Sequence, residues 1–299
     1  MKKVSIITLC WNQLENATKP FIEGLYKYTN PDLFELIIVN NGSDDGTYEY
    51  LEELKDKKDN IILIHNEENL GYSKGNNQAM KIAKGEYLFM LNNDVLFIPN
   101  WLEDMIKILD ENPEIGVIAP RTQLCNVQTQ LIENPSLYTK ENYLEIFNQR
   151  KADKNDFSYC DKIIFFCWGM KRKVFEEVGF LDENFGLAWY EDDDYTLRVA
   201  YKYYRPAIAN NVFLYHNHAQ TSRKLYYELN GKELFEKNRI YFENKHYTFV
   251  TLKKENEILK KKLKLRENFL KNLFYPFFEK RLFAKEKKVI KFLGIKISY

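Results

Sequence analysis

Apolar runs and segments with helical periodicity alternate along the first part of the chain. The apolar runs are rich in aliphatic and aromatic residues, and we interpret them as strands at Val4–Leu9, Glu35–Val39, Ile61–His65, Tyr87–Leu91 and Gly116–Ala119. Between them, apolar residues recur near the 3.6-residue period of a helix at Ala17–Tyr28, Thr47–Leu54, Ser73–Ala83 and Trp101–Glu111. This alternation is typical of βαβ units. It predicts an α/β fold with a mainly parallel central sheet flanked by helices.

Polar segments that follow these strands are where chemistry is expected. Strands this apolar have both faces covered, and open α/β sheets bind their ligands beyond the carboxyl ends of the strands. Residues 121–161 are polar and aperiodic, which predicts a variable loop or small insertion over the site. From about Leu225 the chain becomes lysine-rich with helical spacing. We therefore expect a catalytic domain at 1–224 and a helical, lysine-rich extension at 225–299.

Composition narrows the class of protein. The chain has 299 residues, 45% of them hydrophobic and 29% charged, as in globular proteins. Its formal net charge of +1 gives no overall field that would attract nucleic acid. The four cysteines form no Cys-x-x-Cys pair, which favours reduced thiols in a cytoplasmic protein. No apolar run approaches the roughly 18 residues that span a bilayer.

The first candidate motif is the turn Asn40–Thr47, directly after a predicted strand. Its glycines permit unusual backbone angles, and its aspartates can cap the next helix or clasp the base and ribose of a nucleotide. From the turn alone, these two interpretations have about equal weight. The segment Asn69–Asn77 leads into the next helix in the same way, and a capping loop explains it equally well.

An acidic residue, Asp94, ends the very apolar strand at Tyr87–Leu91, in the run Leu91-Asn92-Asn93-Asp94. An unpaired carboxylate is costly to bury, and a Mg²⁺ or Mn²⁺ ion bound to a diphosphate would be a suitable partner. Capping of the following helix is the alternative.

Four consecutive carboxylates follow two aromatic residues in the run Trp189–Asp194. Such a run is usually a solvated helix start, stabilised by the helix dipole. The aromatic residues before it and the apolar helix after it favour a cleft wall instead, where one carboxylate serves as general base for an acceptor hydroxyl. Further on, His216 and His218 are spaced to share one face of a strand and bind one ion, although an exposed pair without a role fits the spacing equally well.

Taken in order, these segments resemble the family 2 glycosyltransferases of the GT-A fold, particularly bacterial members that build surface polysaccharides or glycolipids. The resemblance covers roughly Lys3–Arg223. The segments that carry it are Thr8–Gln13, Asn41–Thr47, the Asn-x-Gly-Tyr segment at Asn69, Leu91–Asp94, Gly179–Glu183 and Glu191–Asp194. Two positions depart from the family pattern: Asn40 and Asn92 stand where many members have an acid.

The resemblance implies a role for each candidate residue. Asp192, with Glu191 beside it, is the expected catalytic base, and Asp94 with His216 is expected to hold Mn²⁺ or Mg²⁺. The expected acceptor-binding residues are Trp189, Tyr190 and Asp194. The expected contacts to a nucleoside diphosphate sugar are Thr8, Asn12, Asn41, Asp45, Asn69, Gly71, Asn77, Asn92 and Asn93.

The resemblance further implies an inverting transfer to the hydroxyl of a glycan or lipid-linked acceptor. A sugar nucleotidyltransferase and an inactive scaffold of the same fold are the rival interpretations. The lysine-rich extension predicts either attachment to the anionic cytoplasmic face of the inner membrane or self-association into a homo-oligomer.

Overall fold

The computed structural model describes residues 3–217, 231–258, 260, 261, 264, 290–292 and 295–297. The chain divides into two compact units, Met1–Phe242 and Glu243–Tyr299. The predicted boundary between residues 224 and 225 lies outside the described residues, so the domain limits stay a prediction. Among the described residues, no helix is both long and apolar enough to cross a membrane.

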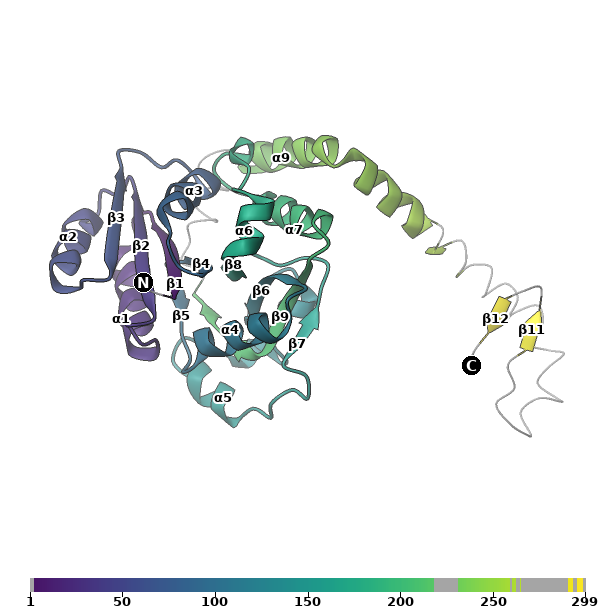
Figure 1. The fold of residues 1–299 in the computed structure, drawn as a ribbon, viewed down its shortest axis with the longest axis horizontal. Coiled ribbons are helices and arrows are strands. Elements are labelled where there is room, and N and C mark those ends of the chain that lie inside the picture. Colours follow the sequence, from purple (N-terminus) through teal and green to yellow (C-terminus); the bar gives the residue numbers. More distant parts are fainter. Residues whose placement is uncertain are drawn as a thin grey trace. The chain divides into compact units, whose positions relative to one another are not determined.

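A mixed eight-stranded sheet forms the centre of the first unit (Figure 1). Its strands, in spatial order, are β3 (Ile61–Asn66), β2 (Phe34–Asn41), β1 (Val4–Cys10), β4 (Tyr87–Asn92), β8 (Cys167–Lys171), β6 (Ile115–Arg121), β9 (Arg205–Phe213) and β7 (Phe157–Tyr159). The first four strands are parallel, β8 runs antiparallel to both of its neighbours, and β9 is parallel to β6. The carboxyl ends of β1, β2 and β4 therefore meet at one edge.

Helices cover both faces of this sheet. On one face pack α1 (Lys19–Tyr28), which the π-helical turn η1 (Leu14–Thr18) precedes, α2 (Thr47–Lys57), α4 (Trp101–Glu111) and α5 (Tyr143–Gln149). On the other pack α3 (Tyr72–Ile82), α6 (Arg172–Val178) and α7 (Glu191–Tyr201). The remaining elements of this unit are β5 (Val95–Leu96), the short 3-10 turns η2 (Gln128–Gln130), η3 (Pro135–Leu137) and η4 (Glu183–Phe185), and β10 (Tyr215–His216). The helix α9 (Gly231–Lys245) begins in this unit and ends in the second.

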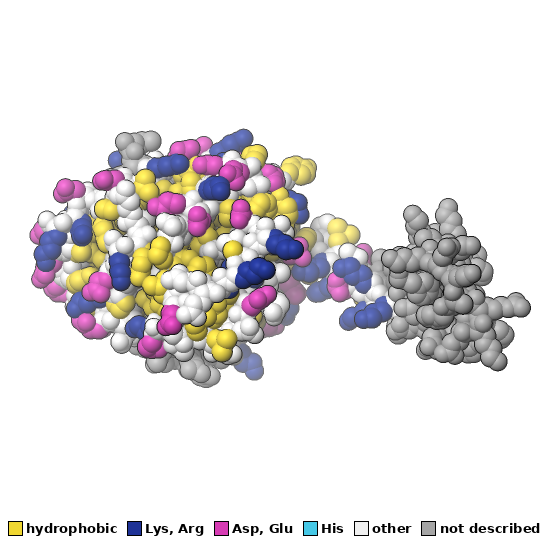
Figure 2. Space-filling view, turned by 90° about the horizontal axis from the view of Figure 1, so that it is seen from below, with side chains coloured by type: hydrophobic (Ala, Val, Ile, Leu, Met, Phe, Trp, Pro, Cys, Tyr) yellow, Lys and Arg dark blue, Asp and Glu magenta, His cyan; other side chains and the backbone are white. Residues whose placement is uncertain are grey.

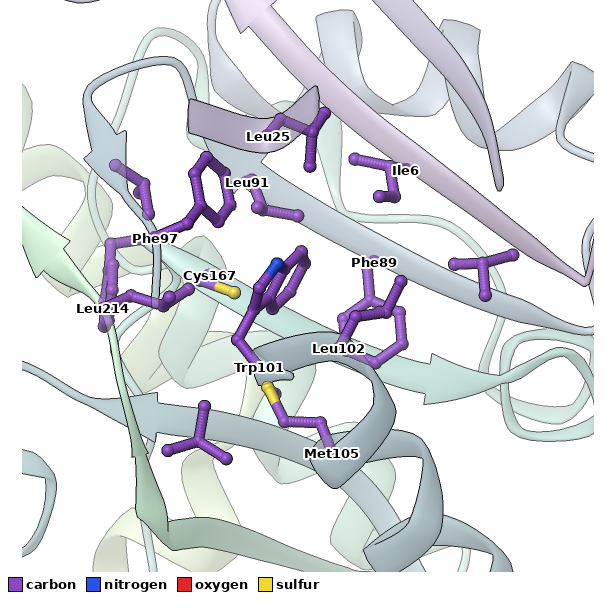
Figure 3. Packing of buried hydrophobic residues seen from close by; sticks show 14 of the residues in the cluster. Ile6, Leu25, Phe89, Leu91, Phe97, Trp101, Leu102, Met105, Cys167 and Leu214 are labelled. Carbon is purple, nitrogen blue, oxygen red and sulfur yellow. The ribbon is translucent and has the colours of Figure 1, made fainter. Parts of the chain in front are cut away.

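Alternate residues of each central strand enter two separate hydrophobic clusters. In β1, Ile6 packs with α1 and α4 while Ile7 packs with α3 and α6. Trp101, fully buried at the start of α4, lies in the middle of the first cluster near Phe89 and Phe97 (Figure 3). Burial on both faces explains why the strands are nearly continuous apolar runs.

The α/β fold with a mainly parallel sheet is confirmed, and the predicted strands and helices of the first part are present. Residues 121–161, however, are more than a loop: they contain η2, η3, α5 and the edge strand β7. Buried polar side chains tie this segment down, with Arg121 donating to Asn210 Oδ1 at 2.8 Å and Arg150 to Asn210 O at 3.1 Å. Such partners lie far apart in the sequence, so periodicity alone does not reveal them.

The second unit continues as helix through residues 247–258 and contains the antiparallel pair β11 (Ile290–Phe292) and β12 (Ile295–Ile297). Leu252 and Ile258 are exposed on this helix. The leucines at 259, 263, 265 and 270, which continue the helical spacing of this lysine-rich segment, lie outside the described residues. In the first unit, the face shown in Figure 2 carries acidic and basic side chains interspersed among apolar ones, in keeping with the near-zero net charge.

Candidate functional site

The site is built at the edge where β1, β2 and β4 end, because the turns that follow these strands carry the predicted residues Asn12, Asp45, Asn93 and Asp94. Asp94 follows β4, and the short strand β5 comes directly after it. The antiparallel pairing of β5 with β10 places His216 opposite Val95. Asp94 Oδ1 consequently lies 3.1 Å from His216 Nε2, and both side chains are only 11% exposed. The backbone N–H of Asn217 donates to Asp94 O at 2.9 Å and fixes the pairing.

Side chains from three other segments hold His216 in place. The side-chain amide of Gln123 accepts from the His216 N–H at 3.2 Å and donates to the His216 carbonyl at 2.7 Å. Phe166 stacks on the imidazole, with ring centroids 5.1 Å apart. Asn92 Nδ2 lies 3.4 Å from His216 Nε2. An imidazole held on both sides in this way has little freedom to turn away from Asp94.

The donor set at Asp94 and His216 fits a hard divalent cation. Asp94 Oδ1 and His216 Nε2, 3.1 Å apart, lie close enough together for both to bind one cation. Among the residues that the structure describes, no group of three or more His, Cys, Asp or Glu side chains converges on one point. An ion here would therefore take most of its ligands from water and phosphate oxygens.

Asparagine side chains shape the loop after β3. Asn41 Oδ1 accepts from Asn66 Nδ2 at 3.0 Å and from the Leu70 N–H at 3.1 Å, while Asn41 Nδ2 donates to Asn69 Oδ1 at 2.9 Å. Asn69 Oδ1 also accepts from the Gly71 N–H at 2.9 Å. Both predicted donor contacts, Asn41 and Asn69, thus hold the backbone of residues 69–71. A direct contact with a nucleotide sugar stays a prediction.

The start of α3 docks against the loop that leads into the acidic run. Gly71 has a φ of 85°, and a Cβ there would lie 2.5 Å from Gly186 O, so the close approach requires glycine. Tyr72 N–H donates to Leu187 O at 3.0 Å. Asn77 donates to Leu181 O and to Glu183 Oε1, both at 2.9 Å. Gly71 and Asn77 therefore position residues 181–187. This segment leads into α7, which begins at Glu191.

Hydrogen bonds tie the turn after β2 to the end of β1. Asp45 Oδ2 accepts from the Leu14 N–H at 2.8 Å, and Asn12 Oδ1 accepts from the Asp44 N–H at 2.9 Å. Burial alone would raise the pKa of Asp45, but its hydrogen bonds to Thr47 and Leu14 outweigh burial and lower that pKa. The exposed Asp45 is thus ionised at neutral pH.

Two further predicted donor contacts lie on the same edge. Thr8 is fully buried in β1, and its hydroxyl has no hydrogen-bond partner among the described residues. Asn93 donates from Nδ2 to Thr18 Oγ1 at 2.9 Å. Asn93 therefore contacts the turn of η1 in this structure, and contact with a donor sugar stays a prediction for both residues.

Two aromatic residues in a rare backbone conformation precede α7. Trp189 and Tyr190 have φ values of 72° and 75°, in the left-handed region that bulky residues seldom occupy. Each such residue costs about 1–3 kcal/mol and persists only where the surroundings fix it. The turn places Glu191, Asp192, Asp193 and Asp194 in the first turn of α7.

The four carboxylates occupy different environments, as acid and base roles require. Asp193 binds Lys162 Nζ at 2.6 Å. Asp194 is fully buried and binds Arg198 Nε at 2.8 Å, and Arg198 also donates to Val178 O and Phe180 O. A structural role accounts for Asp194, and its predicted contact with an acceptor stays untested.

Glu191 and Asp192 are half-buried, as is Asp193. Burial raises the pKa of Glu191 and of Asp192, the charge of Asp192 adds to the rise for Glu191, and Lys162 opposes the rise in each. Glu191 Oε2 has no hydrogen-bond partner among the described residues. Two adjacent carboxyls with raised pKa values are suited to exchange a proton near neutral pH.

The segment before β8 connects the acidic run to the Asp94–His216 pair. Phe165 packs edge-on against Tyr195 of α7, and its carbonyl accepts from the Tyr72 hydroxyl at 3.0 Å. The next residue, Phe166, stacks on His216, and its carbonyl accepts from the Asn92 N–H at 2.8 Å. Two adjacent residues thus contact both halves of the site.

Sequence reasoning missed four residues that support the site: Gln123, Lys162, Phe166 and Asn238. Gln123 and Lys162 lie in or next to the polar stretch that was interpreted as a loop. Phe166 is one apolar residue among many, and Asn238 lies in a lysine-rich helix. For Lys162 the sequence offers one signal: a lysine stands directly before the apolar run that begins at Ile163.

The chain belongs to glycosyl transferase family 2, whose family profile matches residues 5–179. It is 31% identical over 115 residues to an uncharacterized glycosyltransferase of Methanocaldococcus jannaschii, a match that covers 38% of this chain and 40% of that relative. The chain thus matches less than half the length of that relative.

Two solved glycosyltransferases share the fold. One is a mannosyltransferase of Pyrobaculum calidifontis in complex with GDP-Man and Mn²⁺, with a TM-score of 0.55 and 16% identity over 73% of this chain and 58% of that one. The other is TarS of S. aureus in complex with UDP-GlcNAc, with a TM-score of 0.52 and 20% identity over 72% and 58%. At these identities the likeness establishes the fold, and the GT-A architecture that was predicted is confirmed.

The environment of the acidic run leads to a prediction about Lys162. Lys162→Met removes the cation that opposes the raised pKa of Asp192, so that pKa should rise by about 1. Carboxyl-carbon NMR titration of Asp192, assigned by its loss in Asp192→Asn, measures this. Lys171→Met is the matched control, because Lys171 pairs with Asp110 at 3.5 Å elsewhere on the sheet. An unchanged pKa in Lys162→Met would show that Asp192 does not experience this charge.

Proposed function

We propose that this chain is an enzyme that transfers a sugar from a nucleoside diphosphate to an acceptor hydroxyl with the help of Mn²⁺ or Mg²⁺. The observation that carries the proposal is the link through Phe165 and Phe166 between the Asp94–His216 pair and the acidic start of α7. The Asp94–His216 pair suits the diphosphate, because it would hold the cation that binds phosphate oxygens. The acidic start of α7 suits the acceptor, because a carboxylate there would take up the proton of a hydroxyl. Membership of glycosyl transferase family 2 supports the same assignment.

Asp94 and His216 would hold the cation, which supplies positive charge to the departing diphosphate when bound. Asn92 adds an amide beside them but no charge. Thr8 and the turn Asn40–Thr47 line the edge where the nucleotide would bind, with Asp45 ionised and fixed by its hydrogen bonds. The complexes of the structural neighbours with GDP-Man and with UDP-GlcNAc support a nucleoside diphosphate sugar as donor.

Asp192 would accept the proton of the acceptor hydroxyl. The acceptor oxygen forms a bond to the anomeric carbon on the face opposite the diphosphate while the bond from that carbon to the diphosphate oxygen breaks, and the acceptor proton passes to Asp192. Attack from the opposite face inverts the anomeric centre. Lys162 lowers the pKa of Asp192 against the effect of burial, and this favours the ionised form that a general base requires. Trp189 and Tyr190, half-buried just before the carboxylates, would contact the acceptor.

A panel of nucleotide sugars with Mn²⁺ tests the function, with slow hydrolysis of the donor as the readout. We expect metal-dependent turnover with at least one donor. In Asp94→Ala we expect this metal-dependent turnover to be lost, because the amide of Asn92 does not replace a charged ligand. Asp59→Ala, an exposed aspartate before β3, is the matched control. Pyrophosphate-dependent exchange in place of hydrolysis would indicate a sugar nucleotidyltransferase, and binding without turnover would indicate an inactive scaffold.

Substitutions in the acidic run test the assignment of the base. Asp192→Asn should leave folding and donor binding intact while turnover falls by about 10²- to 10⁴-fold, the range for losing a positioned general base. Steady-state kinetics and calorimetry of donor binding measure the two effects. Asp193→Asn, which loses only the pair with Lys162, should be milder. A greater loss in Glu191→Gln would move the role of base to Glu191.

We further propose that the lysine-rich part after Leu252 attaches the enzyme to an anionic membrane surface, which suits a lipid-linked acceptor. Lys253, Lys254 and Lys261 are exposed on the helix, together with Leu252 and Ile258. Each lysine near such a surface contributes about 1 kcal/mol. Lys254 and Lys260 pair with Glu243 and Glu257, and these acids lower the net charge of the helix.

Co-sedimentation with anionic vesicles should show binding at low salt that falls at high salt. Neutral vesicles are the control. A full-length protein that ignores vesicles and forms a dimer, with a truncation after Thr251 that is monomeric, would establish self-association in place of membrane attachment.

A further inference from the structure

One asparagine of α9 holds the backbone that leads into the acidic run. Asn238 is 1% exposed, and its Nδ2 donates to the carbonyls of Phe185 at 2.6 Å, Ala188 at 2.8 Å and Trp189 at 3.1 Å. The Phe185 carbonyl belongs to the last residue of η4, and the other two carbonyls belong to the loop between η4 and α7. Within the first unit, one side chain of α9 thus bridges three peptide groups of the segment that ends at Glu191.

This loop contains the two strained residues of the site. Trp189 and Tyr190 follow Ala188 directly, both with positive φ, and the Trp189 carbonyl is one of the three acceptors. A backbone in this region needs surroundings that fix it. Because α7 begins at the next residue, a change in φ at Tyr190 would swing the first turn of the helix and both carboxylates of the pair.

Aromatic rings of α9 pack around the same loop. Tyr190 contacts Phe235 and Phe242, with ring centroids 5.2 Å and 5.5 Å apart, and Tyr241 packs edge-on against Phe185 at 5.1 Å. The Tyr241 hydroxyl also donates to Asp182 Oδ2 at 2.9 Å. These contacts seat the helix on the loop, but Asn238 is the residue that binds the backbone at the strained turn.

The side-chain amide of Asn238 donates hydrogen bonds to the backbone near α7 but accepts none from the described residues. Its two N–H groups serve three carbonyls, while its Oδ1 is buried without a hydrogen-bond partner among the described residues. An unsatisfied buried oxygen weakens the fold. An apolar side chain would pack α9 against the loop without leaving a buried oxygen unsatisfied. The amide is therefore explained by its hydrogen bonds to the backbone carbonyls.

We propose that Asn238 is a positioning residue for the reaction: it fixes the Trp189–Tyr190 turn and thereby places Asp192 and Glu191 against the acceptor. The proposal rests on the proposed function of the acidic run. Asn238 itself contacts neither the carboxylates nor the Asp94–His216 pair in any described interaction, so its effect passes through the backbone. The donor half of the site should be insensitive to it.

Kinetics of Asn238→Asp test the proposal, because aspartate keeps the shape of asparagine and donates no hydrogen bond. We expect kcat to fall by about 10²-fold, the loss that follows from displacing a catalytic group by about 1 Å, with little change in KM for the donor. In Asn238→Ala, which adds no charge, the acidic limb of the kcat profile should move to lower pH, because a loosened turn lets water reach the carboxylates. Tyr241→Phe is the matched control, since it keeps the ring that packs against Phe185 and loses the hydroxyl that donates to Asp182.

The outcomes separate this proposal from the proposed function. Unchanged kcat in folded Asn238→Asp, an equal loss in Tyr241→Phe, or a rise in KM for the donor would overturn the positioning role. If the wild type turns over no donor, the proposed function fails, and NMR titration of Asp192 then tests the positioning role: its pKa should fall toward the ordinary value in Asn238→Ala, which adds no charge. Should Asn238→Asp not fold, the kinetics of Asn238→Ala replace it. Failure of both to fold would overturn the proposal, because Asn238 would then be required by the fold itself.

Discussion

The site depends on the pairing of two very short strands, β5 and β10. Each strand has only two residues, yet their pairing brings Asp94 at the end of β4 to the end of the chain segment that follows β9. A pair this short is not stable alone. Two residues outside the pair stabilise it. Gln123 hydrogen-bonds to both the N–H and the carbonyl of His216, and the ring of Phe166 stacks on the imidazole of His216. The insertion at residues 121–161 therefore supports the site, because Gln123 lies within it.

The acidic run shows the same dependence on distant segments. Four adjacent carboxylates would repel one another in water-exposed positions, but Asp193 and Asp194 are each paired with a cation, and this leaves Glu191 and Asp192 as the pair with raised pKa. The apolar wall beneath them is formed by rings such as Trp168, which stacks on Phe165 at 3.8 Å and donates to the Tyr72 hydroxyl. Burial by this wall, more than mutual repulsion, raises the pKa values.

The parts of this protein that the sequence predicted are those set by local pattern. Strands such as Val4–Cys10 are apolar on both faces, and helices such as Trp101–Glu111 show a clear apolar stripe, so both were recognised within a residue or so of their ends. The motif residues were recognised by type and order, and their roles stay predictions.

What the sequence did not predict depends on contacts between distant segments. The strand β7 has three half-buried residues and pairs only with β9, which leaves too little pattern to detect. Asn41, Asn69 and Asn77 are predicted to contact a donor, and that prediction stays open; in the structure they also bind backbone groups of loops, for Asn77 about a hundred residues away along the chain. Spacing cannot distinguish an asparagine that binds a ligand from one that builds the loop around it.

The amides at positions 40 and 92 have a common physical consequence. Asn40 accepts from the Ser43 N–H at 3.2 Å and lies 3.3 Å from His65 Nδ1, so it keeps the turn in shape without adding charge. Asn92 likewise adds an amide and no charge beside Asp94 and His216. A cation held by one carboxylate and one neutral imidazole would keep a net positive charge, whereas a second carboxylate would neutralise it. Such an ion would attract a diphosphate more strongly but bind the protein alone more weakly. At the proposed site, binding of a cation and binding of a diphosphate donor would therefore depend on each other.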